Sequence, residues 1–198
     1  TVIFPTLSAL SELGDVDGKR EAMNGAVRFI LIGTIPSAIG LIVVGMPLVS
    51  LLEGGAFNST ATALVYSTLR FFALGIIVHS ILEVIARSFY ADKDTLTPLL
   101  VAFGGAAVNL VTAMAFTGVL TGSPPDVNTV GGLALANTLG VTFEVIALGI
   151  ILRRRWRGLG ENTLARSTAK ALLASLTMAA AIVLVQGLWG MIGLTDQG

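Results

Sequence analysis

Four ionisable side chains stand inside otherwise apolar stretches of the sequence: Arg70, His79, Glu83 and Glu144. A charge in the hydrocarbon core of a membrane is costly, so such residues usually face a protein interior or a water-filled path. They are therefore the candidates for contacting a substrate or coupling an ion. No catalytic residue is predicted, because the sequence offers neither paired acids nor a nucleophile with a base.

Two of these candidates and a nearby arginine are spaced four residues apart. His79, Glu83 and Arg87 therefore form one stripe on a helix, and Glu83 precedes Arg87 in the order that favours an ion pair. One interpretation makes the stripe a proton or cation relay, or a surface that faces the substrate. The other makes it a salt-bridged helix end, which the spacing favours because Arg87 can extend to the membrane surface.

For the other two candidates, Arg70 and Glu144, the sequence leaves two interpretations open. Arg70 lies nine positions before His79, which places the two on opposite faces of a helix. In one interpretation Arg70 binds an anionic head group or a phosphate, and in the other its side chain extends outward to water. Glu144 lies in the middle of an apolar run and shares a helix face with Asn137. In one interpretation Glu144 couples an ion, and in the other it is neutral and hydrogen-bonded to a neighbouring helix.

The composition indicates the environment of these residues. Of the 198 residues, 54% are hydrophobic and 12% are charged, whereas an ordinary soluble domain carries roughly 25% charged residues. There is no cysteine and one histidine, which excludes disulfides and a metal-ligand cluster, and no cofactor is predicted. The basic run at 153–157 follows an apolar run directly, so it predicts contact with anionic lipid rather than nucleic acid.

Five apolar runs are long enough to cross roughly 30 Å of hydrocarbon as helices. They lie near 27–52, 64–86, 99–120, 130–152 and 171–194. The sequence thus predicts an all-α, polytopic transmembrane helical bundle with about five membrane-spanning helices. We expect residues 1–26 to be a helix tail and a hydrated cytoplasmic lead-in, 27–194 the membrane part, and 195–198 an end on the outer side.

Basic residues are distributed unevenly between the connections. Eleven of the twelve lie in or beside 11–28, 87–98 and 153–170, and the exception is Arg70. Five spans would place these three segments on one side of the membrane. Because positively charged connections stay in the cytoplasm, we expect this side to be cytoplasmic.

Proline and small residues predict how the spans bend and pack. Pro36 and Pro47 fall inside the first run, where each removes a backbone hydrogen bond, so that helix is expected to bend. Small residues at Gly33 with Ser37, and around Gly104, predict close approach of helix backbones.

The connection at 87–98 carries a recognisable motif, Phe-Tyr-Ala-x-x-Asp-Thr-x-Thr-Pro. It resembles the signature of the MviN/MurJ family of lipid II flippases and is formed by Phe89, Tyr90, Ala91, Asp94, Thr95, Thr97 and Pro98. Segments 4–8, 35–41 and 54–57 are similar to other parts of that family. The likeness in motifs extends through roughly the first half of the chain, and beyond Asn109 it rests on hydropathy.

The signature is also explained as a structural corner. Pro98 suits the first turn of a helix, and Thr95 or Asp94 can cap that helix. Phe89 and Tyr90 are expected to anchor the preceding helix at the membrane interface. We expect the corner to be the motif's main role, because residues that cap helices are commonly structural.

The resemblance implies a fourteen-helix transporter of the multidrug/oligosaccharidyl-lipid/polysaccharide exporter superfamily in the bacterial cytoplasmic membrane. This chain would supply about the ninth to thirteenth helices, and the upstream lobe of the same protein would be its partner. The implied function is to move lipid II, an undecaprenyl-diphosphate-linked precursor, across the membrane by alternating access among the membrane lipids. Alternatives are a flippase for another polysaccharide lipid, a drug or ion antiporter, and a degenerate flippase that serves as a scaffold for cell-wall machinery.

Overall fold

A computed structural model describes residues 3–55, 57–118, 127–159 and 161–193. These residues form six helices: α1 (Ile3–Glu12), α2 (Val16–Ser50), α3 (Ser59–Ala91), α4 (Leu96–Phe116), α5 (Val127–Arg155) and α6 (Glu161–Gly193). Outside the helices, the described part contains one isolated β-bridge, between Gly54 and Phe57. Five of the helices, α2 to α6, are long and apolar enough to cross a membrane. The predicted all-α transmembrane bundle is therefore confirmed.

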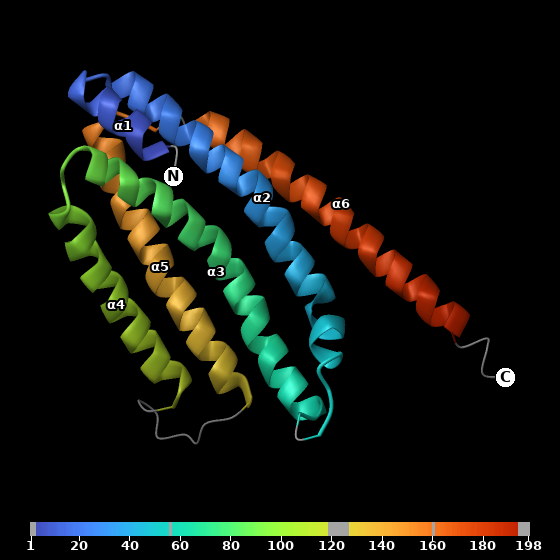
Figure 1. Ribbon diagram of the computed structural model, residues 1–198. Coiled ribbons are helices and arrows are strands. Elements are labelled where there is room, and N and C mark those ends of the chain that lie inside the picture. The colour runs from blue at the N-terminus through green and yellow to red at the C-terminus, as the bar shows by residue number, and fades with distance from the viewer. Residues whose placement is uncertain (1–2, 56, 119–126, 160, 194–198) are drawn as a thin grey trace.

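The five long helices lie side by side in the order α4, α5, α3, α2, α6 (Figure 1). Helix α3 packs on α2 and α5, while α4 packs mainly on α5 and α6 packs on α2. The short α1 contacts α2 and α3 at the end of the bundle where α2 begins and α3 ends (Figure 1). Chain order and spatial order therefore differ, because α5 lies between α3 and α4.

Helix α2 begins at Val16, well before the apolar run that starts near residue 27. Its first turns carry Lys19 and Met23, which are only 6% and 2% exposed. The expectation of a hydrated lead-in is thus wrong for these two side chains. The helix continues through Pro36 and Pro47 without ending at either.

A cluster of buried apolar residues lies toward the end of the bundle that carries most of the basic residues. On α2 it contains Met23, Val27, Leu31 and Ile35, at every fourth position, which places them on one face of the helix. It is completed by Val84, Ile85 and Phe89 of α3, Leu148 and Leu152 of α5, and Trp156 and Ala171. This core joins four of the spans, α2, α3, α5 and α6, and includes Phe89 of the signature motif.

A side chain outside the helix caps the first turn of each of three spans. Asp15 accepts a hydrogen bond from the backbone N–H of Gly18 at 2.8 Å, and Asn58 accepts one from Ala61 at 3.0 Å. Asp94 accepts one from Thr97 at 2.9 Å. These bonds satisfy N–H groups that have no partner within their own helix. Asp94 is therefore the cap of α4, whereas Thr95 makes no side-chain capping bond.

Glycine allows α4 and α5 to approach closely. A Cβ atom added at Gly140 would lie 2.7 Å from the backbone oxygen of Gly105 and 2.9 Å from the Cβ of Asn109. A Cβ added at Gly104 would lie 2.8 Å from the ring of Phe143. The predicted close packing around Gly104 is confirmed. The same prediction for Gly33 is wrong within the described residues, where a Cβ at this position meets no atom within 4 Å.

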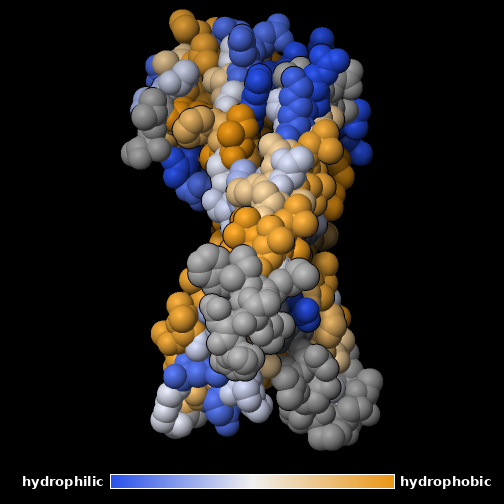
Figure 2. Space-filling model, turned by 90° about the vertical axis from the view of Figure 1, so that its right-hand side faces the viewer, coloured by the Kyte–Doolittle hydropathy of each residue, from blue (hydrophilic) through white to orange (hydrophobic). Residues whose placement is uncertain are grey.

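The surface separates by polarity along the length of the bundle. Figure 2 shows hydrophilic residues gathered over the end that holds α1 and the start of α2, with a hydrophobic band across the middle. Large apolar side chains of the spans are exposed, including Phe103 of α4 at 67% and Leu173 of α6 at 65%. Exposed apolar surface of this extent is expected where lipid is the solvent.

Candidate functional site

The structure brings together polar residues from α3 and α5 inside the membrane part. The Nε2 atom of His79 lies 3.3 Å from the Oδ1 atom of Asn137, and Glu144 is close enough to His79 for a coulombic interaction. Thr138, only 7% exposed, donates a hydrogen bond to the backbone oxygen of Phe71 at 3.3 Å. We call His79, Asn137 and Glu144 the intramembrane polar row.

The side chain of Glu144 reaches toward α4. A Cβ atom at Gly105 would collide with its carboxyl group, so only glycine leaves room for the acid at this position. Glu144 is half-buried, while His79 remains exposed. The polar row therefore connects three helices, α3, α4 and α5, and it is accessible from the side of His79.

Glu83 and Arg87 form the predicted ion pair on α3, with Arg87 donating from Nη2 and from Nε, the latter at 3.1 Å. His79 shares their stripe, but its hydrogen bond in the structure goes to Asn137. The pair lines one side of a groove of about 610 Å³ between α1, α2 and α3. Apolar side chains that include Ile3, Phe29 and Ile30 line the rest of it.

Arg70 lies apart from the other candidates. Its side chain is exposed, and its guanidinium carbon lies 4.9 Å from the centre of the Phe71 ring. This contact fits a cation stacked on its neighbouring aromatic residue. The structure does not join Arg70 to the intramembrane polar row.

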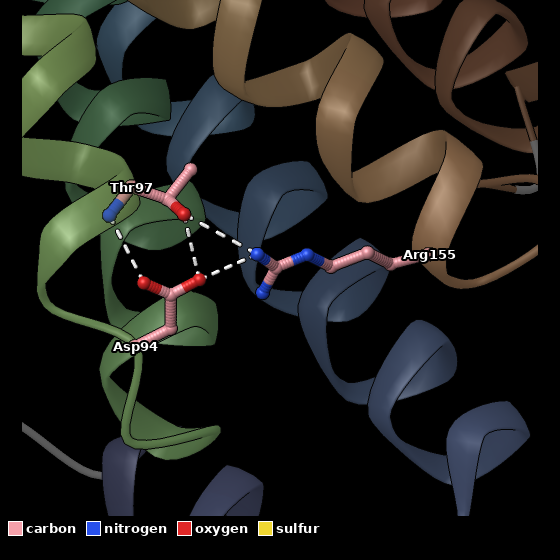
Figure 3. A network of polar contacts seen from close by, with 3 residues as sticks. All are labelled: Asp94, Thr97 and Arg155. Atoms are coloured by element: carbon pink, nitrogen blue, oxygen red, sulfur yellow. Dashed lines mark hydrogen bonds and ion pairs between the residues drawn. The ribbon is translucent and has the colours of Figure 1, made fainter.

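The signature motif forms a compact corner between α3 and α4, held by α5 (Figure 3). The Oδ2 atom of Asp94 accepts hydrogen bonds from the Thr97 hydroxyl at 2.7 Å and from Arg155 at 2.5 Å. Arg155 also donates to the Thr97 hydroxyl at 3.2 Å, and its guanidinium lies 5.1 Å from the centre of the Phe89 ring. The corner thus fastens the end of α5 to the start of α4.

These donors stabilise the ionised form of Asp94. The backbone N–H of Thr97 has the largest effect, followed by the Thr97 hydroxyl and then Arg155, and together they lower the pKa of Asp94 from 3.8 to about 2. The carboxylate therefore stays charged at neutral pH. The structural explanation of the motif accounts for Asp94, Thr97 and Phe89.

Phe89 departs from the role expected for it. Its side chain is fully buried in the core cluster, whereas Tyr90 is 44% exposed. The prediction that both rings anchor α3 at the interface is therefore wrong for Phe89. Burial follows from helix geometry, because Ile85 and Phe89 are four residues apart and share one face.

A second polar network at the same end was not predicted from the sequence. Asp92 accepts hydrogen bonds from Ser11 and Lys19, each at 2.7 Å. Lys19 also lies 5.6 Å from the centre of the Trp156 ring, and Arg20 donates to the backbone oxygen of Trp156. These contacts join α1, α2, α3 and the end of α5. The spacing of residues along the sequence could not predict these contacts, because Lys19 and Asp92 are 73 residues apart.

Within the described ranges there is no cluster of three metal-ligating side chains. The chemistry available to the intramembrane row is hydrogen bonding, charge pairing and protonation, by an imidazole, an amide and a carboxylate.

The sequence and the fold are both similar to those of known proteins. The family model described as "Lipid II flippase MurJ" matches residues 1–195. The chain belongs to the lipid II flippase MurJ family. A probable lipid II flippase MurJ from Rhizobium tropici is 30% identical over 189 residues, which cover 95% of this chain and 34% of that protein. The corresponding protein of Rhizobium meliloti is 30% identical, with 92% and 33% covered.

A solved MurJ structure supports the same assignment. The structure described as "Lipid II flippase MurJ, inward closed conformation" matches with a TM-score of 0.72 and 28% identity. The match covers 93% of this chain and 36% of that one. The chain thus spans about a third of the length of the MurJ relatives it matches. The resemblance inferred from the signature is confirmed, and it extends beyond Asn109 to nearly the whole chain.

Proposed function

We propose that the full-length protein moves lipid II across the bacterial cytoplasmic membrane, and that this chain supplies helices of its C-terminal lobe. The observation that carries the proposal is the match of the MurJ family model to residues 1–195. The names of the relatives and of the similar solved structure support the same substrate. No feature of the chain favours the antiporter or the scaffold. Like its relatives, the protein is a transporter rather than an enzyme.

The physical problem of such a transporter is to carry a polar head group through hydrocarbon while the lipid tail stays in it. Alternating access solves this problem when one helical lobe rocks against another around a polar path. The wide apolar surface of α4 and α6 suits contact with lipid tails, while the intramembrane polar row offers hydrogen-bonding groups at depth. We infer that His79 and Glu144 contact the path or couple an ion.

Glu83 and Arg70 have separate proposed roles. Glu83, with Arg87, lines the groove beside α1 and α2, where a charged pair can meet a head group that enters from the basic end. Arg70 lies on the exposed side of α3, where a guanidinium suits a phosphate. The orientation with the basic end in the cytoplasm follows from the distribution of lysine and arginine. The upstream lobe would form the other side of the path.

Depletion of the full-length protein tests the proposal. We expect lipid II to accumulate in the inner leaflet and growth to stop, with both restored by the wild-type gene. A version with alanine at Arg70, His79, Glu83 and Glu144 should be made and inserted but should restore transport at least about tenfold less well, since each intramembrane polar group is costly to keep without a role. The control replaces four exposed polar residues outside these helices' membrane parts, Glu12, Asp17, Lys93 and Arg166, and should restore transport fully.

Two results would contradict different parts of the proposal. If depletion leaves lipid II evenly distributed between leaflets, lipid II is not the substrate and another polysaccharide lipid must be tested. If depletion blocks transport but the version with four alanines restores it, the function stands and the proposed residues have no role in it.

A further inference from the structure

A second polar site lies at the end of α5, away from the intramembrane row. A pocket of about 450 Å³ is lined by Ile150, Arg153, Arg154, Arg157 and Gly158. Among the described residues that line it, every ionisable one is an arginine. We call it the arginine pocket. Planar guanidinium groups that converge on one space form a site for an anion, and they bind phosphate with two parallel hydrogen bonds.

The backbone around the arginine pocket is held in place from the inside. Trp156 is 2% exposed and packs in the core, and Arg155 turns away to Asp94. Arg157 adopts a φ of 53°, and Gly158 closes the turn with its N–H on the backbone oxygen of Arg153 at 3.0 Å. Two fixed residues, Arg155 and Trp156, therefore separate Arg153 and Arg154 from Arg157, and they hold the backbone from which these arginines extend.

Arg154 and Arg157 carry the site. Arg153 has an interaction of its own, whereas Arg154 and Arg157 form no ion pair with any residue in the described ranges. Basic residues in the last turn of a helix also offset the helix dipole. That effect explains Arg154, but it does not explain Arg157, which lies beyond the end of α5 at Arg155.

An apolar face of α5 leads into the arginine pocket. Leu139, Phe143, Ile146 and Ile150 are between 39% and 56% exposed, and their spacing of four, three and four residues places them on one side of the helix. Ile150 also lines the pocket. The face lies within the candidate span Thr129–Arg155, so an acyl chain can lie along it while its head group is at the arginines.

We propose that the arginine pocket binds the phosphate of an anionic phospholipid whose acyl chain lies along the apolar face of α5. The ligand is a structural membrane lipid of the phosphatidylglycerol type, held independently of the transported substrate. Charge complementarity favours it over a zwitterionic lipid, because the ammonium group of phosphatidylethanolamine would be repelled by the arginines that line the pocket. A continuous apolar face favours a lipid over a soluble phosphate.

The test measures binding of phosphatidylglycerol to the full-length protein in detergent by native mass spectrometry. The double variant Arg154→Gln with Arg157→Gln should bind it about 25-fold more weakly, at roughly fivefold for each basic residue near an anionic head group. The matched control is Arg166→Gln with Lys170→Gln, which removes the same charge from exposed positions on α6 near the same end. The control should bind phosphatidylglycerol as the wild type does.

Three outcomes would overturn the proposal. Equal weakening in both double variants would mean that general positive charge attracts the lipid. Binding that is unchanged in Arg154→Gln with Arg157→Gln would mean that the lipid lies elsewhere. Competition by soluble glycerol 3-phosphate at the same concentration as the lipid would mean that the site takes a free phosphate and that the apolar face has no role.

Discussion

Replacement of Phe89 by alanine is expected to cost about 4 kcal/mol of folding stability, which is typical of a fully buried aromatic residue. The ring is 0% exposed and packs in the cluster shared by α2, α3 and α5. Its loss leaves a cavity at the point where these spans meet, and it also removes the surface on which the Arg155 guanidinium lies. The apparent melting temperature of the full-length protein in detergent would measure the effect.

Tyr90 provides the matched control, because it is the next residue of the same motif but is 44% exposed. Tyr90→Ala should lower stability by less than about 1 kcal/mol, as substitutions near the surface usually do. If both variants lose the same amount, Phe89 is not in the core and α3 does not pack on α2 and α5 through this face.

Replacement of Asp94 by alanine is expected to lower folding stability by about 2 kcal/mol, which is the second large effect. Loss of a helix cap costs about 1 kcal/mol, and loss of a charged hydrogen bond adds a similar amount. The second contribution is reduced because the Arg155 side chain is 39% exposed, so that water screens part of the interaction. Asp94→Asn should cost less, since its amide oxygen can still accept from the Thr97 N–H.

The contribution of Asp94 should also depend on pH. The pKa of this carboxyl falls from 3.8 to about 2 in the folded protein, so its stabilising effect is complete above about pH 5 and is lost as the pH falls toward 2. The stability difference between wild type and Asp94→Asn should therefore shrink between about pH 5 and about pH 2.5. A difference that stays constant over this range would mean that the charge of Asp94 does not stabilise the fold.

The number of spans could be predicted because each crosses the membrane as one long apolar run, and hydropathy detects such runs directly. The Glu83–Arg87 pair and the cap by Asp94 could also be predicted, since both depend on neighbours three or four residues away. The start of α2 could not be predicted from hydropathy, because polar residues such as Lys19 lie in a helix that begins before the apolar run.

Contacts between distant segments could not be predicted in the same way. The pairing of His79 with Asn137 requires α5 to lie against α3, and only the packing of the helices decides that arrangement. The bonds from Lys19 to Asp92 and from Arg155 to Asp94 likewise join residues 73 and 61 positions apart. The burial of Phe89 has the same cause, because an aromatic residue near a helix end suits either the interface or a core.

Threading of the chain through the membrane is tested most directly by labelling single cysteines. The sequence contains no cysteine, so Ser59→Cys at the start of α3 and Ala165→Cys near the start of α6 can be introduced one at a time, in a full-length protein whose other cysteines are replaced. Both positions are exposed, and they lie at opposite ends of the bundle (Figure 1). A maleimide that cannot cross membranes should label Ser59→Cys in intact spheroplasts and Ala165→Cys only after lysis. Labelling of both from outside would contradict the five-span arrangement and the transport function proposed on it.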